Sequence, residues 1–184
     1  MSKNSMYRKS LKKQWATRFK TIHPDGDCYD GVVVKENENF IVLLSEENFE
    51  FDGIVILPKS VIKGYRDSRF EKCLNRILCH NGQIKKVKIP TWLENCVSLE
   101  DILRQFNRRN IWPIVEILHD KKKDSSLYIG PILKGNHNEF CLHCFDASGK
   151  WEKKYIIQYK EIFKLEFGSK YCRYFNSFMK GKKS

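Results

Sequence analysis

Two stretches of this chain repeat each other, NFIVLLSEENFEFDGIVILPKSVI at residues 39–62 and EFCLHCFDASGKWEKKYIIQYKEI at residues 139–162. Both alternate apolar runs with turns, and they align without a gap. The matched pairs are Phe40 and Phe140, Phe51 and Trp151, and Ile62 and Ile162. Self-similarity at a fixed spacing indicates one structural unit used twice. We therefore expect two copies of the same small fold.

The match extends on both sides of these stretches. Residues 14–34 and 67–78 of the first copy lie against residues 111–133 and 168–179 of the second. The matched pairs are Trp15 and Trp112, Gly31 and Gly130, Ser68 and Ser169, Phe70 and Tyr171, and Asn75 and Asn176. The repeat predicts a domain at 1–78, a connector at 79–97 and a domain at 98–184. The connector is too apolar for a free linker, so we expect it to pack across both domains.

Short β-type runs separated by turn residues fill each copy. In the first copy they span 15–22, 28–35, 40–45, 52–57 and 61–66. Connections of hairpin length imply an antiparallel meander, and a short twisted sheet buries its inner face best by closing. The predicted fold class is therefore mostly β with short helices (α+β): two tandem five-stranded small barrels, each preceded and followed by a helix.

Helices are predicted at both ends of each copy. Tyr7, Leu11 and Trp15 are four residues apart and form one apolar stripe of a leading helix. The second leading helix should begin at Ser98, because Ser98 and Asp101 have the spacing of a capping box.

The helix that follows the first copy has a similar start signal. Ser68 stands three residues before Glu71, which again predicts a capping box. Phe70, Leu74 and Ile77 are its apolar positions, so we expect these three side chains to face inward.

Positive charge is the main clue to function. The formal net charge is +12, and residues 1–20 contain seven basic residues and no acidic one. Basic runs with interspersed aromatic residues are typical of proteins that bind RNA or single-stranded DNA. The candidate contacts are Arg8, Lys9, Lys12, Lys13, Lys85, Lys86, Lys88, Lys121, Lys122 and Lys123. Two other readings remain open: a merely well-hydrated surface, and an adaptor for an acidic or ribonucleoprotein partner.

The sequence FCLHCFD at 140–146 has the CxxC spacing of a metal site. The repeat matches Cys141 with Ile41 and Cys144 with Leu44, so the thiols occupy positions that are aliphatic in the other copy. Residues three apart on a strand point to opposite faces, and no second CxxC is present. We therefore expect core thiols and no metal, although His137 and His143 could assist a metal site.

Other features of the sequence limit the compartment and the kind of protein that we expect. The chain has 184 residues and seven cysteines without a framework spacing, which favours a reducing compartment without disulfides. No apolar run of about 18 residues occurs, and residues 1–15 lack the apolar centre of a secretory signal. We expect a cytoplasmic protein that does not cross a membrane and is a monomer or small oligomer.

Catalytic motifs are missing from the sequence. Phosphate loops, nucleophile elbows, HExxH and paired carboxylates do not occur. The five histidines are dispersed and mostly near turns, which is typical of surface residues: His23, His80, His119, His137 and His143. We expect a non-enzymatic binding protein without a cofactor.

The order of a helix and five strands resembles the Sm-like fold, which includes the bacterial host-factor RNA chaperone. The resemblance rests on the turn and strand that reach Gly31, the strand 40–44 and the last strand through Val61 and Ile62. SH3-like barrels share this pattern. The resemblance implies RNA binding, but the uracil-binding turns of Sm proteins are replaced here by residues 36–41 and 62–64.

Overall fold

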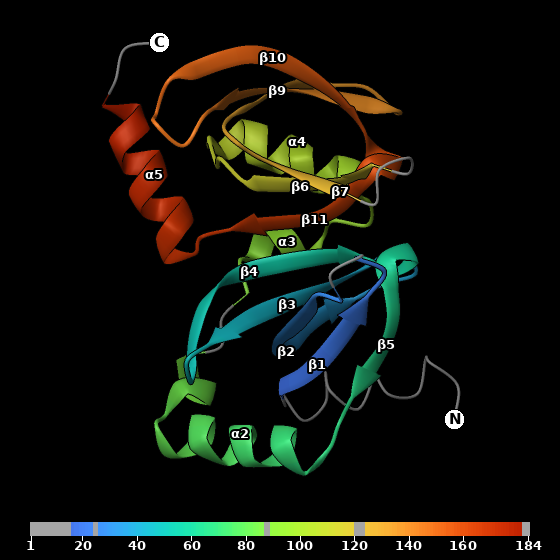
Figure 1. Cartoon of the computed structure of the whole chain (residues 1–184), viewed down its shortest axis with the longest axis vertical. Helices are drawn as coiled ribbons and strands as arrows, with labels where there is room; N and C mark the ends of the chain where they lie inside the picture. Colours follow the sequence, from blue (N-terminus) through green and yellow to red (C-terminus); the bar gives the residue numbers. More distant parts are fainter. Residues whose placement is uncertain (1–15, 24–25, 87–88, 120–123, 182–184) are drawn as a thin grey trace. The chain divides into compact units, whose positions relative to one another are not determined.

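The computed structural model of the chain describes residues 16–23, 26–86, 89–119 and 124–181, except for the side chains of Lys86 and Asp124. It divides into two compact units, the first up to Glu94 and the second from Asn95. The described residues are mostly β-strand with four α-helices (Figure 1). No helix in this part of the chain is both long and apolar enough to span a membrane.

The first unit is an antiparallel meander followed by a helix. Its strands have the order β5-β1-β2-β3-β4. The elements are β1 (Ala16–Thr21), β2 (Cys28–Glu36), β3 (Phe40–Glu47), β4 (Glu50–Pro58), η1 (Lys59–Val61), β5 (Ile62–Arg66), α2 (Arg69–His80), η2 (Gln83–Lys86) and α3 (Thr91–Glu94). All five strands predicted from the sequence are confirmed, with small shifts at their ends.

The second unit uses the same order of pairing. Its first strand pairs with its last and its second, as in the first unit. The elements are α4 (Leu99–Arg109), β6 (Ile114–His119), β7 (Asp124–Ile129), β8 (Ile132–Gly135), β9 (Glu139–Phe145), β10 (Trp151–Gln158), η3 (Tyr159–Glu161), β11 (Ile162–Phe167) and α5 (Lys170–Lys180). Here β11-β6-β7 and β10-β9-β8 are separate ladders.

The sheets of the described residues are open, so the predicted closed five-stranded barrels are not confirmed. In the second unit the strand that matches β2 is divided into β7 and β8 at Gly130 and Pro131. Proline has no N–H group to donate to a ladder, which accounts for a break at this point.

Two matched glycines let the backbone come close to a neighbouring strand, β3 in the first unit and β9 in the second. A Cβ atom at Gly31 would lie 2.5 Å from the carbonyl oxygen of Leu44. A Cβ atom at Gly130 would overlap the carbonyl oxygen of His143. Glycine at these matched positions therefore permits a close approach of backbones that a side chain would prevent.

The helix that follows the last strand of each unit, α2 or α5, packs on the first strands of that unit. In the first unit Ala16, Val32 and Leu78 form a buried cluster. In the second, Trp112 packs with the α5 residue Met179, which the repeat matches with Leu78. Both methionine and leucine side chains are fully buried. The core of each unit therefore includes the inner face of α2 or of α5.

The predicted helix starts are confirmed, whereas the inward face predicted for α2 is right for Leu74, which packs on the core cluster, and wrong for Phe70. Ser68 and Ser98 form capping boxes with Glu71 and Asp101. Phe70 is 60% exposed, however, and the buried residues of α2 are polar as well as apolar: Glu71, Asn75 and Leu78. Leu74 and Ile77 are half-buried. The leading helix predicted around Tyr7, Leu11 and Trp15 lies outside the described residues.

The predicted connector 79–97 contributes η2 and α3 to the first unit. Lys35 on β2 donates hydrogen bonds from Nζ to the carbonyl oxygens of Leu93 and Glu94, at 2.8 and 2.6 Å. A cation at these carbonyls satisfies acceptors that a short helix leaves open at its end. The first unit therefore extends beyond the predicted boundary at residue 78, and packing of the connector across both units stays a prediction.

Replacing Gly31 with Ala should destabilise the first unit by about 2–3 kcal/mol, because the new methyl group meets backbone that cannot rotate away. Urea unfolding followed by circular dichroism measures this loss. Gly64→Ala is the matched control, since nothing lies within 4 Å of a Cβ at that position. Equal midpoints for the two variants would contradict the close approach.

Candidate nucleic-acid interface

Most of the basic residues predicted from the sequence to bind nucleic acid lie outside the described part of the chain. These are Arg8, Lys9, Lys12, Lys13, Lys88, Lys121, Lys122 and Lys123. Lys85 is exposed on η2, and Lys86 ends that element. These residues therefore stay candidates, and the described geometry neither assembles nor separates them.

A different basic surface is formed by α5, the last helix of the second unit. The helix begins at the N-cap Ser169, and its inner face buries Cys172 and Met179. Asn176 donates a hydrogen bond from Nδ2 to the carbonyl oxygen of Trp112, at 2.9 Å. These contacts fix which side of α5 meets solvent.

The outer face of α5 carries three aromatic side chains. Tyr171, Tyr174 and Phe178 are 49%, 74% and 56% exposed. Spacings of three and four residues place them on one side of a helix. The ring of Tyr171 also lies 4.9 Å from that of Phe175, which stacks on the core ring of Phe145. The stripe is thus attached to the core at one edge.

Cations accompany this aromatic stripe, and acidic residues do not. Lys170, Arg173 and Lys180 are exposed on α5, and no acidic residue occurs between Lys170 and Lys180. The Lys180 ammonium lies 5.1 Å from the centre of the Trp112 ring and donates to the carbonyl oxygen of Asn110. We call the exposed residues 170, 171, 173, 174 and 178 the α5 face.

The matching helix of the first unit has the same character. Arg69, Phe70 and Lys72 on α2 match Lys170, Tyr171 and Arg173 on α5 in the repeat, and all six side chains are exposed. Both helices thus present a cation, an aromatic ring one residue later and a second cation two residues after the ring. The intervening residue is buried in each case, as Glu71 or Cys172.

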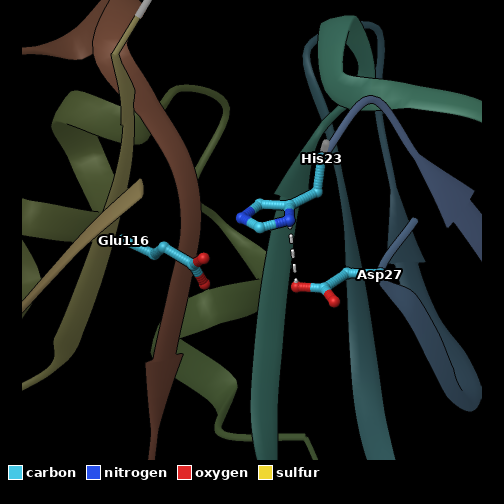
Figure 2. A group of neighbouring side chains, drawn as sticks. All are labelled: His23, Asp27 and Glu116. Atoms are coloured by element: carbon cyan, nitrogen blue, oxygen red, sulfur yellow. Dashed lines mark ion pairs between the residues drawn. The ribbon is translucent and has the colours of Figure 1, made fainter. Parts of the chain in front are cut away.

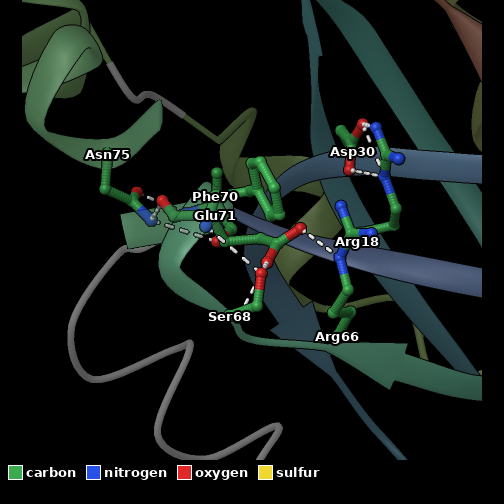
Figure 3. A network of polar contacts seen from close by, with 8 residues as sticks. Arg18, Asp30, Arg66, Ser68, Phe70, Glu71 and Asn75 are labelled. Atoms are coloured by element: carbon green, nitrogen blue, oxygen red, sulfur yellow. Dashed lines mark hydrogen bonds and ion pairs between the residues drawn. The ribbon is translucent and has the colours of Figure 1, made fainter. Parts of the chain in front are cut away.

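Glu71 is the only acidic residue of α2, and it points inward. It is 3% exposed, accepts hydrogen bonds from the Ser68 N–H and hydroxyl at 2.7 and 2.6 Å, and pairs with Arg66 at 2.7 Å (Figure 3). Burial alone would raise its pKa, but the hydrogen bonds from Ser68 and Arg66 outweigh burial and lower the pKa to about 2.

Two other ion pairs form within single units. Arg18 on β1 makes a bidentate pair with Asp30 on β2, with Nε 2.8 Å from Oδ1 (Figure 3). On α4, Glu100 accepts from Arg104 at 2.6 Å, one turn away. Arg104 lies within 4 Å of two carboxylates, Glu100 and Asp101, so α4 is a weaker candidate for phosphate binding than α2 and α5.

The thiols of FCLHCFD lie in the core of the second unit, as predicted. Cys141 and Cys144 are buried, and the Cys144 thiol donates to a carboxylate oxygen of Glu152 at 3.4 Å. Burial, together with this neighbouring carboxylate, raises the pKa of Cys144 to about 12. Zinc binds thiolates, and this environment favours the protonated thiol.

The nearby histidines are engaged elsewhere. His143 packs its ring 4.5 Å from that of Trp151, and His137 is exposed with Nδ1 3.3 Å from Glu100. His23 differs from the predicted surface histidine, because it is buried with Nδ1 3.5 Å from Asp27 (Figure 2). A histidine flanking a strand end can be buried when a carboxylate partners its ring.

The comparisons with known proteins give no relative: no protein-family model, no curated protein and no solved structure matches the chain. α2 and α5 are therefore candidates by their geometry alone. A sequence signal for the α5 face does exist, since residues 167–184 contain aromatic and basic side chains and no carboxylate.

Glu71→Gln should remove a pH-dependent part of the stability of the first unit. The pKa falls from 4.5 to about 2 in the folded state, and one pKa unit corresponds to about 1.4 kcal/mol, so the carboxylate contributes on the order of 3 kcal/mol at neutral pH. This contribution is present above about pH 5 and is lost as the pH falls toward 2.

Urea unfolding of both proteins between pH 6 and pH 3 measures the effect. The difference in stability between wild type and Glu71→Gln should shrink as the pH falls. Asp67→Asn is the control, because Asp67 is an exposed carboxylate next to the same helix. A constant difference across this range would rule out the charged network around Glu71.

Thiol labelling should divide the cysteines into two classes. Cys28, Cys73 and Cys79 are exposed and should react quickly with iodoacetamide at pH 8 in the folded protein. Cys96, Cys141, Cys144 and Cys172 are buried and should react only after unfolding. Peptide mass spectrometry identifies the labelled positions. Rapid labelling of Cys144 in the folded protein, or a lower labelling of Cys144 when zinc is added, would contradict its assignment to the core.

Proposed function

We propose that this protein binds nucleic acid, RNA or single-stranded DNA, through the α5 face and without catalysis. The observation that carries the proposal is the pair of matched helices, in which cation, ring and cation recur at the same exposed positions and neither helix has an exposed carboxylate. Lysine and arginine attract the phosphate backbone, and aromatic rings stack on bases.

The spacing of the exposed rings on α5 suits a single-stranded nucleic acid. Tyr171 and Tyr174 are three residues apart, which corresponds to about 4.5 Å along a helix axis. Adjacent rings at this separation, with Arg173 between them in sequence, offer stacking and phosphate contacts within one turn. The three large exposed rings also indicate an interaction site, since exposed apolar patches usually mark such sites.

We infer that each unit is a diverged small barrel of the Sm-like or SH3-like class. The support is the pairing of the last strand with the first in both units, together with the short η1 and η3 turns that precede the last strand. A protein with seven free thiols suits the reducing cytoplasm, which is the compartment that we propose.

Neutralising two cations of the α5 face should weaken binding and reduce its salt dependence. The double variant Lys170→Gln, Arg173→Gln should lower the magnitude of the slope of log affinity against log salt by about 1.5. Each phosphate contact that is lost reduces the number of counterions released on binding. Fluorescence anisotropy with a labelled single-stranded RNA of about 20 nucleotides measures the slope.

The control removes the same charge elsewhere in the second unit, as Arg108→Gln with Lys160→Gln, both exposed. This control should keep the wild-type slope to within a few tenths. If the wild-type protein binds neither RNA nor single-stranded DNA at low salt, the proposal is excluded and the protein-adaptor alternative is favoured. Replacing Arg8, Lys9, Lys12 and Lys13 by Ser in the same assay tests the contribution of the basic run predicted from the sequence.

A further inference from the structure

Phe70 is a large ring in solvent with two guanidinium groups beside it. It lies in the first turn of α2 and is 60% exposed. The guanidinium carbons of Arg66 and Arg69 lie 5.6 and 5.2 Å from the centre of its ring. Guanidinium and ring are the two groups on which unpaired bases stack in protein complexes.

Arg66 is held in place from the buried side of the helix. Its Nε donates to Oε1 of Glu71 at 2.7 Å, and Oε2 of the same carboxylate accepts from Ser68 (Figure 3). This hydrogen bond uses one of the five N–H groups of a guanidinium. The two terminal nitrogens carry the other four, which can donate to a phosphate in a bidentate manner.

The helix that carries Phe70 is itself fixed. Asn75 accepts from the Ala16 N–H at 2.7 Å and donates to the Ala16 carbonyl oxygen at 3.1 Å. The ring and its cations are therefore presented on a helix that is attached to β1. A prearranged site loses less conformational entropy when a ligand binds.

The neighbouring charges favour a negatively charged ligand. Lys63, Lys72 and Arg76 are exposed on β5 and α2, and Asp67 is the exposed carboxylate among residues 62–80. An apolar protein segment would match the ring but would gain nothing from the two guanidinium groups beside it. A nucleotide matches both, because its base is flat and its phosphate is anionic.

We infer that Phe70, Arg66 and Arg69 form a second nucleic-acid site, in the first unit, which selects single strands by stacking an unpaired base. This inference rests on the proposed function. Duplex bases are stacked on one another and expose only their edges and phosphates, so the Phe70 ring discriminates against them. Glu71 is the positioning residue of this site, since it acts through Arg66.

Native mass spectrometry of the full chain with a single-stranded RNA of about six nucleotides tests this inference, because such an oligomer suits one small site. Wild type should bind two oligomers. Phe70→Asn should bind one, and its affinity for a longer single strand should fall about tenfold, as expected for one lost stacking contact. Affinity for a duplex of the same sequence should change less than twofold.

Phe49→Asn is the matched control. Phe49 is also a half-exposed phenylalanine of the first unit, but it stands beside Glu46, Glu47 and Glu50. It has a positive φ of 65°, which asparagine accepts readily. This variant should bind two oligomers as wild type does. Thermal unfolding of both variants confirms that each is folded.

The outcomes separate the two proposals. No binding by wild type overturns the proposed function. Binding by wild type that Lys170→Gln with Arg173→Gln weakens, while Phe70→Asn behaves like Phe49→Asn, overturns only the second site. An equal loss of single-strand and duplex affinity in Phe70→Asn overturns the stacking role.

Discussion

One hydrogen-bonded pair determines which side of α2 meets solvent. Asn75 satisfies both backbone groups of Ala16 at the start of β1, and its Nδ2 also donates to the Glu71 carbonyl oxygen at 2.7 Å. A buried amide with these partners avoids the cost of unsatisfied polar groups. With Asn75 turned inward, Phe70 must point outward, because the two positions are five residues apart on a helix. The exposed ring is thus a consequence of the anchor.

The second unit uses the same residue with one partner fewer. The repeat matches Ala16 with Pro113, and proline has no N–H to donate. Asn176 instead donates to the carbonyl oxygen of Trp112, one residue before the matched position, and its Oδ1 is buried without a hydrogen-bond partner among the described residues. Packing compensates here, since Phe175 stacks on Phe145 and Met179 is fully buried.

Local signals in the sequence predicted the elements well, whereas long-range contacts decided the rest. Capping boxes at Ser68 and Ser98 were predictable because two residues at a fixed spacing suffice. The inward face of α2 was not, since counting apolar residues overlooks Glu71 and Asn75, whose burial depends on partners far away in sequence. Barrel closure depends on pairing between distant strands. The exposed faces of α2 and α5 depend on which of their residues pack inward, which a run of basic residues does not indicate.

The positive faces of α2 and α5 result more from where carboxylates are absent than from how many cations the chain has. The sequence contains 22 acidic residues, and α4 shows the usual arrangement, with Glu100 and Asp101 both within 4 Å of Arg104. The only carboxylate of α2 is instead turned into the protein, where it caps the helix and holds Arg66. Arg69 and Lys72 consequently face solvent without an acidic neighbour on their own helix surface, and their field extends about a Debye length toward an anionic ligand.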